Sequence, residues 1–201
     1  MSAREQIFSA IRGALAPLPH RESRPDVPRG VADAQWMGAE ADTVKLFKDR
    51  ASAVGTLCFS SVGELVSWIS GQKPGKIFIP SELSAIASQL GTDVALTSEY
   101  QRPAVDEIDV AITPAAAGIA ESGTIILTDD CTPDRLAALA PWTHIAVLRK
   151  DSIHRSIADA IAAMPDDPNI VWVTGPSKTA DVEGILIKGV HGPGIQGCLL
   201  I

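Results

Sequence analysis

Cysteine is scarce in this chain of 201 residues, and the three that occur, Cys58, Cys131 and Cys198, form no CxxC pair. Iron–sulfur and structural zinc sites need about four ligands, usually with two close in sequence. This spacing argues against a cluster or zinc site built from this chain alone, so we expect it to bind no cofactor of this kind. Cys58 and Cys198 lie in apolar, strand-like segments, which favours buried, unpaired side chains.

The sequence also lacks any run of about 18 apolar residues, the length that a membrane-spanning helix needs. Its first 21 residues carry charges inside their apolar spacing, unlike the smooth apolar core of a signal peptide. These two absences predict a cytoplasmic protein that does not insert into a membrane.

Basic residues are too few and too scattered to form a patch. The chain has 17 Lys and Arg against 24 Asp and Glu, for a net charge of −7, and the cations occur singly. A surface that binds a phosphate backbone needs clustered Lys and Arg. Nucleic acid is therefore not an expected partner.

The segment VTGPSKTADVEG, residues 173–184, lacks the glycines with which a P-loop wraps phosphate groups. It does place the hydroxyls of Ser177 and Thr179 and the ammonium group of Lys178 in a turn after an apolar strand. These groups suit an anion. A capped turn in which the following acids, Asp181 among them, pair with a neighbouring cation explains the same residues, and the pattern leaves both readings open.

The chain contains 46% hydrophobic residues, enough for one core of ordinary size together with an appendage. Residues 4–15 place their apolar side chains on one helical stripe, which predicts a short amphipathic helix. Residues 16–30 contain four prolines and alternating charges, so they predict a linker or a surface arm. We expect residues 1–36 to form the helix and arm, and residues 37–201 to form the folded domain.

From about residue 37, short apolar runs alternate with helical patterns, beginning with a helix that carries Val44, Phe47 and Ala51. Further helices are expected from Ser61, from Ser81 to Gly91, from Thr132, and from Ser152 to Met164. The expected strands include KIFIP, DVALT, IDVAIT, GTIILT, HIAVL and NIVWVT. Such an alternation predicts an α/β fold in which helices cover both faces of an open, mostly parallel sheet, giving three layers.

Ligands of such sheets bind outside the carboxyl ends of the strands. We therefore expect the functional residues in the loops after IDVAIT, GTIILT, HIAVL and NIVWVT. In the first of these regions, alanines and glycines flank Glu121, so the backbone can approach another group closely. Glu121 can serve there as a nucleophile or base, or it can be a surface residue of a tightly packed turn.

The run after GTIILT contains three acids, Asp129, Asp130 and Asp134, but not the glycine-centred spacing of a calcium loop. Helix capping accounts for Asp134 as well as metal binding does. Arg135 is the stronger candidate, because a guanidinium group beside a strand end can hold a carboxylate bidentately. His144 begins a strand, where a satisfied structural role is the more common one.

A last candidate, His191, lies between a valine and a Gly-Pro-Gly turn. The turn suits an imidazole that is held in position to contact a ligand. It equally suits a ring that closes the turn by bonding the backbone.

Four segments together resemble the lactate utilization protein C family, which is built on the LUD domain. They are MSAREQIFSAIRGAL, ITPAAAGIAESGTIIL, RLAALAPWTHIAVL and VTGPSKTADVEGILIKGVHGP. The resemblance implies a fold similar to the sugar-phosphate isomerase and CoA-transferase superfamily. It also implies a part in the oxidation of L-lactate to pyruvate, with two companion proteins of which at least one carries iron–sulfur clusters.

The residues that match the family's motifs are the ones we predict to be functional. Glu121 is the candidate catalytic residue, and Gly123, Thr124, Arg135, Gly175, Ser177, Lys178, Thr179, Asp181 and His191 are the candidate anion-binding residues. Lys178 stands where the family usually has Arg, which keeps the charge but loses the planar fork. The ending GIQGCLLI also departs from the family, whose members often carry a second His there.

Two functions follow as hypotheses. In the first, the chain is a subunit without a cluster that binds a small carboxylate or phosphorylated ligand and acts with companion lactate utilization proteins. In the second, it is an independent enzyme of the CoA-transferase and isomerase kind, with Glu121 as nucleophile or base and the GPSKT loop holding an anion. An assembly protein without a ligand, and a homo-oligomer, are also compatible with the sequence.

Overall fold

The computed structural model describes residues 2–16, 42–91, 94–164, 167, 169–180 and 185–201. The predicted Pro-rich arm lies almost entirely outside the described residues. Contacts divide the chain into two units, Met1–Asp33 and Ala34–Ile201. None of the helices within the described ranges is long and apolar enough to span a membrane.

Helix α1 (Ala3–Leu15) is the amphipathic helix that the apolar spacing predicts. It begins with a capping box, because the Ser2 hydroxyl accepts a hydrogen bond from the Glu5 N–H and the Glu5 carboxylate accepts one from the Ser2 N–H. The apolar stripe is exposed along its length, and it consists of Ile7, Phe8, Ile11 and Leu15.

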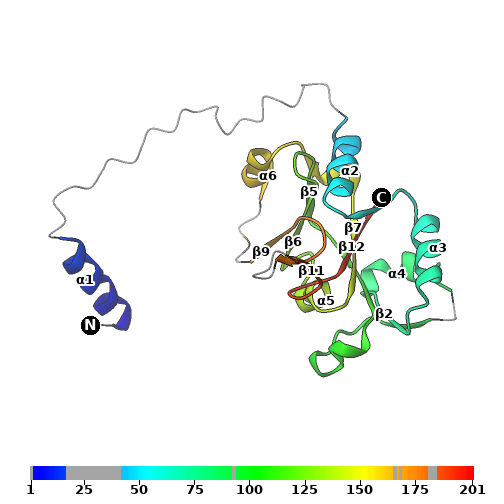
Figure 1. Ribbon diagram of the computed structural model, residues 1–201, viewed down its shortest axis with the longest axis horizontal. Coiled ribbons are helices and arrows are strands. Elements are labelled where there is room, and N and C mark those ends of the chain that lie inside the picture. Colours follow the sequence, from blue (N-terminus) through cyan, green and yellow to red (C-terminus); the bar gives the residue numbers. More distant parts are fainter. Residues whose placement is uncertain (1, 17–41, 92–93, 165–166, 168, 181–184) are drawn as a thin grey trace. The chain divides into compact units, whose positions relative to one another are not determined.

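A six-stranded, wholly parallel sheet forms the centre of the second unit, which confirms the predicted fold class (Figure 1). Its strands, in spatial order, are β1 (Leu57–Phe59), β12 (Ile195–Leu200), β7 (Thr143–Leu148), β4 (Val110–Pro114), β2 (Lys76–Phe78) and β3 (Ala95–Thr97). Every residue of β7 is buried. A strand that is buried along its whole length requires both faces of the sheet to be covered.

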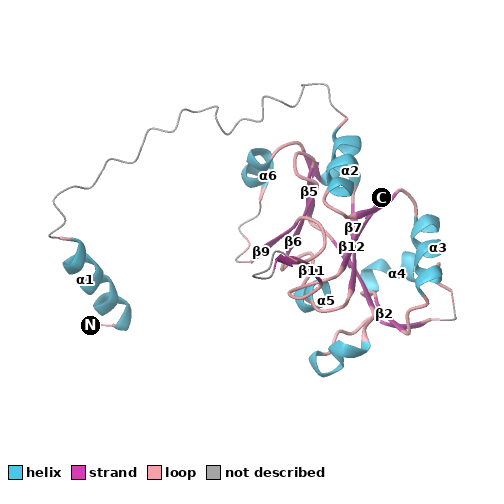
Figure 2. Ribbon diagram, in the orientation of Figure 1, coloured by secondary structure: helices cyan, strands magenta, loops and turns pink. Residues whose placement is uncertain are grey.

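One face of the sheet packs against α3 (Val62–Gln72), the short 3-10 helix η1 (Ser81–Leu83) and α4 (Ser84–Ala87) (Figure 2). Helix α3 starts where the sequence predicts, since the Ser61 hydroxyl accepts a hydrogen bond from the Glu64 N–H. The Glu64 carboxylate accepts one from the Ser60 N–H, one residue before the position of a standard capping box.

The opposite face is covered by α2 (Thr43–Ala53), α5 (Arg135–Leu139) and a second sheet. This sheet has the order β8 (Ile153–His154), β5 (Ala117–Ile119), β6 (Thr124–Thr128) and β9 (Ile170–Val173). Strand β6 runs antiparallel to both β5 and β9. The expectation that GTIILT and NIVWVT belong to the parallel sheet is therefore wrong. Residues 120–123 form a turn too short for the crossover that parallel strands require.

Two predicted helix starts, at Thr132 and Ser152, are also wrong, and a third, at Ser81, is right in position but lacks the predicted cap. Ser81 makes no capping hydrogen bond, and it opens the short 3-10 helix η1. Thr132 uses its hydroxyl to donate to the Pro114 carbonyl at 2.7 Å, so α5 begins three residues later. Ser152 ends the 3-10 helix η3 (Lys150–Ser152), and α6 (Ile157–Ala163) starts only after the capping box of Ser156. At Thr132 a tertiary contact takes the hydroxyl that would cap a local helix, and at Ser152 the backbone N–H donates to the Arg149 carbonyl in a turn.

The chain leaves β9 through a two-stranded ribbon, β10 (Lys178–Ala180) paired with β11 (Leu186–Lys188), before entering β12. It leaves β3 through the 3-10 helix η2 (Arg102–Glu107). Strand β2 connects outward to β3 at the sheet edge, whereas β4, on the other side of β2, connects inward to β7. Connections that leave neighbouring strands in opposite directions open a crevice at the carboxyl ends, between β2 and β4.

Candidate functional site

The two glycine turns of the family-like motifs meet at the last turn of α2. Gly123 has a φ of +67°, and a Cβ added there would lie 2.2 Å from the Ala51 backbone nitrogen. Gly175 has a φ of +77°, and its added Cβ would lie 2.6 Å from the Val54 carbonyl oxygen. The close approach expected around Glu121 is therefore present, but the group approached is this chain's own helix.

Side chains next to these glycines also contact the end of α2 or one another. The Lys178 ammonium group donates to the Val54 carbonyl at 3.0 Å, where a cation stabilises the carbonyl end of a helix. The Thr124 hydroxyl lies 2.7 Å from the Thr174 hydroxyl and so links the starts of two segments 50 residues apart. Among the described contacts, these groups bind the protein itself.

Ser177 holds the GPSKT and HGP segments together. Its N–H donates to the Pro193 carbonyl at 2.8 Å, its carbonyl accepts from the Gly189 N–H at 3.0 Å, and its hydroxyl accepts from the His191 N–H at 3.3 Å. His191 is exposed, and Thr179 pairs with β11. This junction precedes the first residue of β12, so it lies at the amino edge of the parallel sheet. Asp181 lies outside the described residues.

Glu121 sits in the turn between β5 and β6 and contacts the start of α6. Its Oε2 atom accepts a hydrogen bond from the Ile157 N–H at 3.0 Å, and its own N–H donates to the Arg155 carbonyl at 3.1 Å. A carboxylate at this position satisfies one of the free amides of a helix N-terminus. The geometry thus gives Glu121 a structural task, and its predicted catalytic role stays a prediction.

We expect Glu121→Ala to lower the free energy of unfolding by about 1 kcal/mol, the usual cost of losing a helix-capping acceptor. Glu121→Gln keeps an oxygen that can accept from the Ile157 N–H and should cost less than half as much. Urea unfolding of the three proteins measures this difference. A Gln variant that folds like the parent but loses a lactate-dependent activity would instead assign the carboxylate a chemical role.

His144 is wholly buried between two neutral polar partners, which agrees with the structural role expected for it. Its Nδ1 lies 3.1 Å from Gln196 Oε1, an atom that can only accept, so Nδ1 carries the ring proton. Nε2 then accepts from the Thr113 hydroxyl at 2.9 Å. Burial lowers the pKa of His144 from its ordinary value to about 4, so the ring is neutral.

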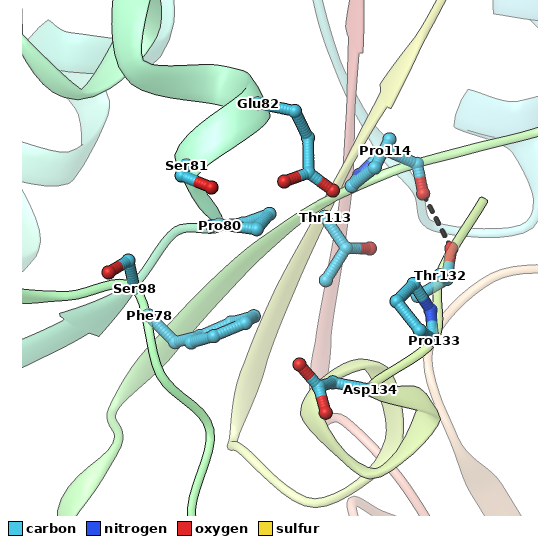
Figure 3. A pocket seen from close by; sticks show the side chains of 10 residues that line it. All are labelled: Phe78, Pro80, Ser81, Glu82, Ser98, Thr113, Pro114, Thr132, Pro133 and Asp134. Atoms are coloured by element: carbon cyan, nitrogen blue, oxygen red, sulfur yellow. Dashed lines mark hydrogen bonds between the residues drawn. The ribbon is translucent and has the colours of Figure 1, made fainter. Parts of the chain in front are cut away.

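A cavity of about 130 Å³ lies in the crevice between β2 and β4 (Figure 3). Figure 3 shows the carboxylates of Glu82 and Asp134 on opposite sides of Thr113. The cavity is lined by Phe78, Pro80, Ser81, Glu82, Ser98, Thr113, Pro114, Thr132, Pro133 and Asp134. The loops after IDVAIT and GTIILT thus line this cavity, whereas the loops after HIAVL and NIVWVT do not.

A wider groove of about 570 Å³ adjoins this cavity, because both are lined by Pro133 and Asp134. Its other lining residues are Tyr100, Arg102, Arg135, Leu136, Leu139 and Val171. Sequence reasoning found Arg135 but missed Arg102, Tyr100 and Glu82. These three follow β2 and β3, and including the carboxyl ends of KIFIP and DVALT among the candidate loops would have found them.

One of the predicted acidic residues, Asp129, forms an ion pair with Arg135 and hydrogen bonds with two further residues. Asp129 Oδ1 lies 2.7 Å from Arg135 Nε, and its Oδ2 accepts from Asn169 Nδ2 at 2.8 Å. Asp167 accepts from the Asp129 N–H at 2.9 Å. Within the described ranges, no group of three or more His, Cys, Asp or Glu is placed to hold a metal ion. Asp129 instead pairs with a guanidinium group.

Comparison with known proteins covers most of the chain. A family model described as the LUD domain matches residues 44–201. "Lactate utilization protein C" of Bacillus subtilis is 31% identical over 173 residues, which are 75% of this chain and 71% of that protein. Proteins of the same name from Deinococcus radiodurans and Oceanobacillus iheyensis are 31% and 35% identical, over 59% and 50% of this chain. In those two, the match spans 58% and 46% of the relative's length, about half.

A solved structure supports the fold alone. The crystal structure of a DUF162 family protein from Deinococcus radiodurans superposes with a TM-score of 0.56 at 23% sequence identity. The superposition covers 82% of this chain and 99% of that one. The α/β architecture is therefore shared with an experimentally determined structure.

Proposed function

Because this chain belongs to the LUD domain family, we propose that it takes part in lactate utilization, as a ligand-binding subunit of a system that oxidises L-lactate to pyruvate. The observation that carries the proposal is the identity of 31% over 173 residues with a protein named lactate utilization protein C. The ligand-binding part of the proposal is supported by the cavity and groove at the carboxyl ends of β2, β3 and β4.

The oxidation of lactate needs an electron acceptor, which we assign to partner proteins. Cys58 and Cys198 face each other on β1 and β12, whereas Cys131 lies in the loop before α5. Burial raises the pKa of all three thiols, which disfavours the thiolate form that ligates a cluster. These residues do not fit a four-thiolate site, so iron–sulfur clusters are expected in the companion proteins.

The alternative, an independent enzyme that uses Glu121 and the GPSKT loop, receives less support from the contacts. Glu121 accepts a hydrogen bond from the start of α6, and Lys178 donates to the end of α2. Both groups are thus used within the fold. They also lie away from the groove and cavity, whose linings include neither residue.

Deleting the gene for this chain should abolish or strongly slow growth on L-lactate, while growth on pyruvate is retained. A plasmid-borne copy should restore growth on lactate and, when tagged, should copurify with the companion proteins. Growth on lactate at the parental rate after deletion would contradict the proposal. Restored growth without copurification would contradict the part of the proposal in which this chain is bound to companion proteins.

A further inference from the structure

We propose that the groove between Arg102 and Arg135 binds a small 2-hydroxycarboxylate, with its carboxylate on the two guanidinium groups and its hydroxyl against Asp134. The groove is lined by all three residues. Two arginines supply the fork geometry that a carboxylate accepts, and the Asp134 carboxylate in the same lining supplies an acceptor for a hydroxyl donor. The choice of L-lactate as the probe rests on the proposed function.

Arg135 is positioned for this task by contacts behind it. Its Nε atom lies 2.7 Å from Asp129 Oδ1, and Asp129 is held in turn by Asn169. The Arg135 side chain is still 37% exposed. The ion pair with Asp129 restrains the Arg135 side chain, and its partial exposure leaves the guanidinium group accessible to a second carboxylate. Positioning of this kind lowers the entropy lost when a ligand binds.

Arg102 supplies the second cation of the lining from the start of η2. Its guanidinium group forms no ion pair with any residue that the structure describes. An exposed arginine without an internal partner keeps its hydrogen-bond donors for a ligand. Arg102 and Arg135 come from segments that follow different strands, so only the tertiary fold makes them a pair.

The groove also carries negative charge, which favours a ligand with a hydroxyl group beside its carboxylate over a plain anion. Asp134 lines the groove, and the pKa of Tyr100 is raised first by burial and then by the nearby charges of Asp134 and Asp106. The Tyr100 hydroxyl donates to the Leu136 carbonyl at 3.3 Å. A ligand that carries a carboxylate at one end and a hydroxyl donor beside it matches both signs of charge.

The GPSKT loop is the competing anion site, and its contacts favour the groove instead. Lys178 donates to Val54, and the Ser177 hydroxyl accepts from the His191 N–H. That loop also lies at the amino edge of the parallel sheet, whereas the groove adjoins the cavity at the carboxyl ends. Ligands of open α/β sheets bind at the carboxyl ends.

Calorimetric titration of the full chain with L-lactate, pyruvate, propionate and inorganic phosphate tests the site. Arg102→Ala and Arg135→Ala should each weaken L-lactate binding about tenfold or more, the usual loss for a charge-assisted hydrogen bond. Arg135→Lys should recover only part of the loss, because it keeps the charge without the fork. Thermal unfolding of each variant separates a binding defect from a folding defect.

Two matched controls accompany these variants. Arg149→Ala removes an exposed guanidinium group that is paired with Asp151 outside the groove, and it should leave binding unchanged. The double variant of Ser177→Ala and Lys178→Ala should bind L-lactate as the parent does. If the double variant loses binding and the arginine variants keep it, the anion site is the GPSKT loop and the groove proposal is wrong.

Asp134→Ala tests the hydroxyl contact. The parent should bind L-lactate more tightly than propionate, which has the same carboxylate but no hydroxyl. Asp134→Ala should remove this preference, since the acceptor for the lactate hydroxyl is lost. Asp134 then no longer repels the carboxylate of either ligand. An unchanged preference would overturn the assignment of Asp134.

A parent chain that binds none of the four probes also overturns the groove proposal. Participation in lactate utilization is judged separately, by growth of the deletion strain. A chain needed for growth but unable to bind would be a subunit without this ligand site. A chain that binds lactate but is dispensable for growth would keep the site and lose the proposed function.

Discussion

Gly123→Ala is expected to destabilise the folded domain by about 3 kcal/mol or more, the sum of a left-handed backbone and a steric clash. The residue has a φ of +67°, and its added Cβ would lie 2.2 Å from the Ala51 nitrogen and 2.5 Å from the Ala51 Cα. Neither is the end of a flexible side chain. The variant can fold only if the turn after β5 or helix α2 moves away, which opens the core around Phe47.

Two other glycines allow the cost of the left-handed backbone to be measured apart from the cost of the steric clash. Gly91 has a φ of +82° with nothing within 4 Å of an added Cβ, so Gly91→Ala should cost only about 1 kcal/mol for the left-handed conformation. Gly71 lies near the end of α3, and nothing lies within 4 Å of its added Cβ. Gly71→Ala should therefore stabilise the domain, by up to about 1 kcal/mol.

Urea unfolding of the three variants against the parent measures the series. The expected order of stability is Gly71→Ala, parent, Gly91→Ala and Gly123→Ala. Gly123→Ala as stable as Gly91→Ala would mean that α2 does not press on the turn. The conclusion that the ESGT segment packs closely on α2 would then be wrong.

Acidification should weaken the fold through His144, by about 3 kcal/mol between pH 6.5 and pH 4. The folded pKa is about 4 and the ordinary value is 6.5, so the unfolded chain binds a proton in this window and the folded chain does not. The stability contributed by the neutral ring is fully present above the ordinary pKa. It is lost as the pH falls toward the folded pKa.

The two side chains that hydrogen-bond the His144 ring are uncharged, which makes a matched variant possible. His144→Gln can still donate to Gln196 Oε1 and accept from the Thr113 hydroxyl, but it does not titrate. Between about pH 7.5 and about pH 5, the parent should lose about 2 kcal/mol more stability than this variant. Carboxylates titrate in both proteins, so the difference isolates the histidine. Equal losses would show that His144 is not buried as a neutral ring.

Local sequence pattern predicted the elements better than it predicted their neighbours. Ser61 with Glu64 marked the start of α3 correctly, because a capping box involves residues three apart. GTIILT has the composition of a buried strand, and it is one, but it pairs with β5 and β9 rather than with the parallel sheet. Apolar periodicity shows that a strand is covered on both faces, and it does not show which strand lies beside it.

The candidate site shows the same limit. Arg135 was predicted from its place after an apolar strand, but Arg102 lies 33 residues earlier and carries no motif of its own. The motif-like residues Gly123, Gly175 and Lys178 were predicted to hold an anion, and in the structure they contact the end of α2. Small residues in a turn indicate a close approach, and they do not identify the group that is approached.

The sequence by itself determined the amphipathic helix at residues 4–15, the α/β class and the resemblance to the LUD family. These depend on periodicities of two and 3.6 residues and on ordered motifs, which the chain carries locally. Only the tertiary structure decided that GPSKT faces the amino edge and that Arg102 and Arg135 line one groove, which adjoins the cavity at the carboxyl ends of β2 and β4. Both results depend on strand order, which long-range packing selects and local pattern does not encode.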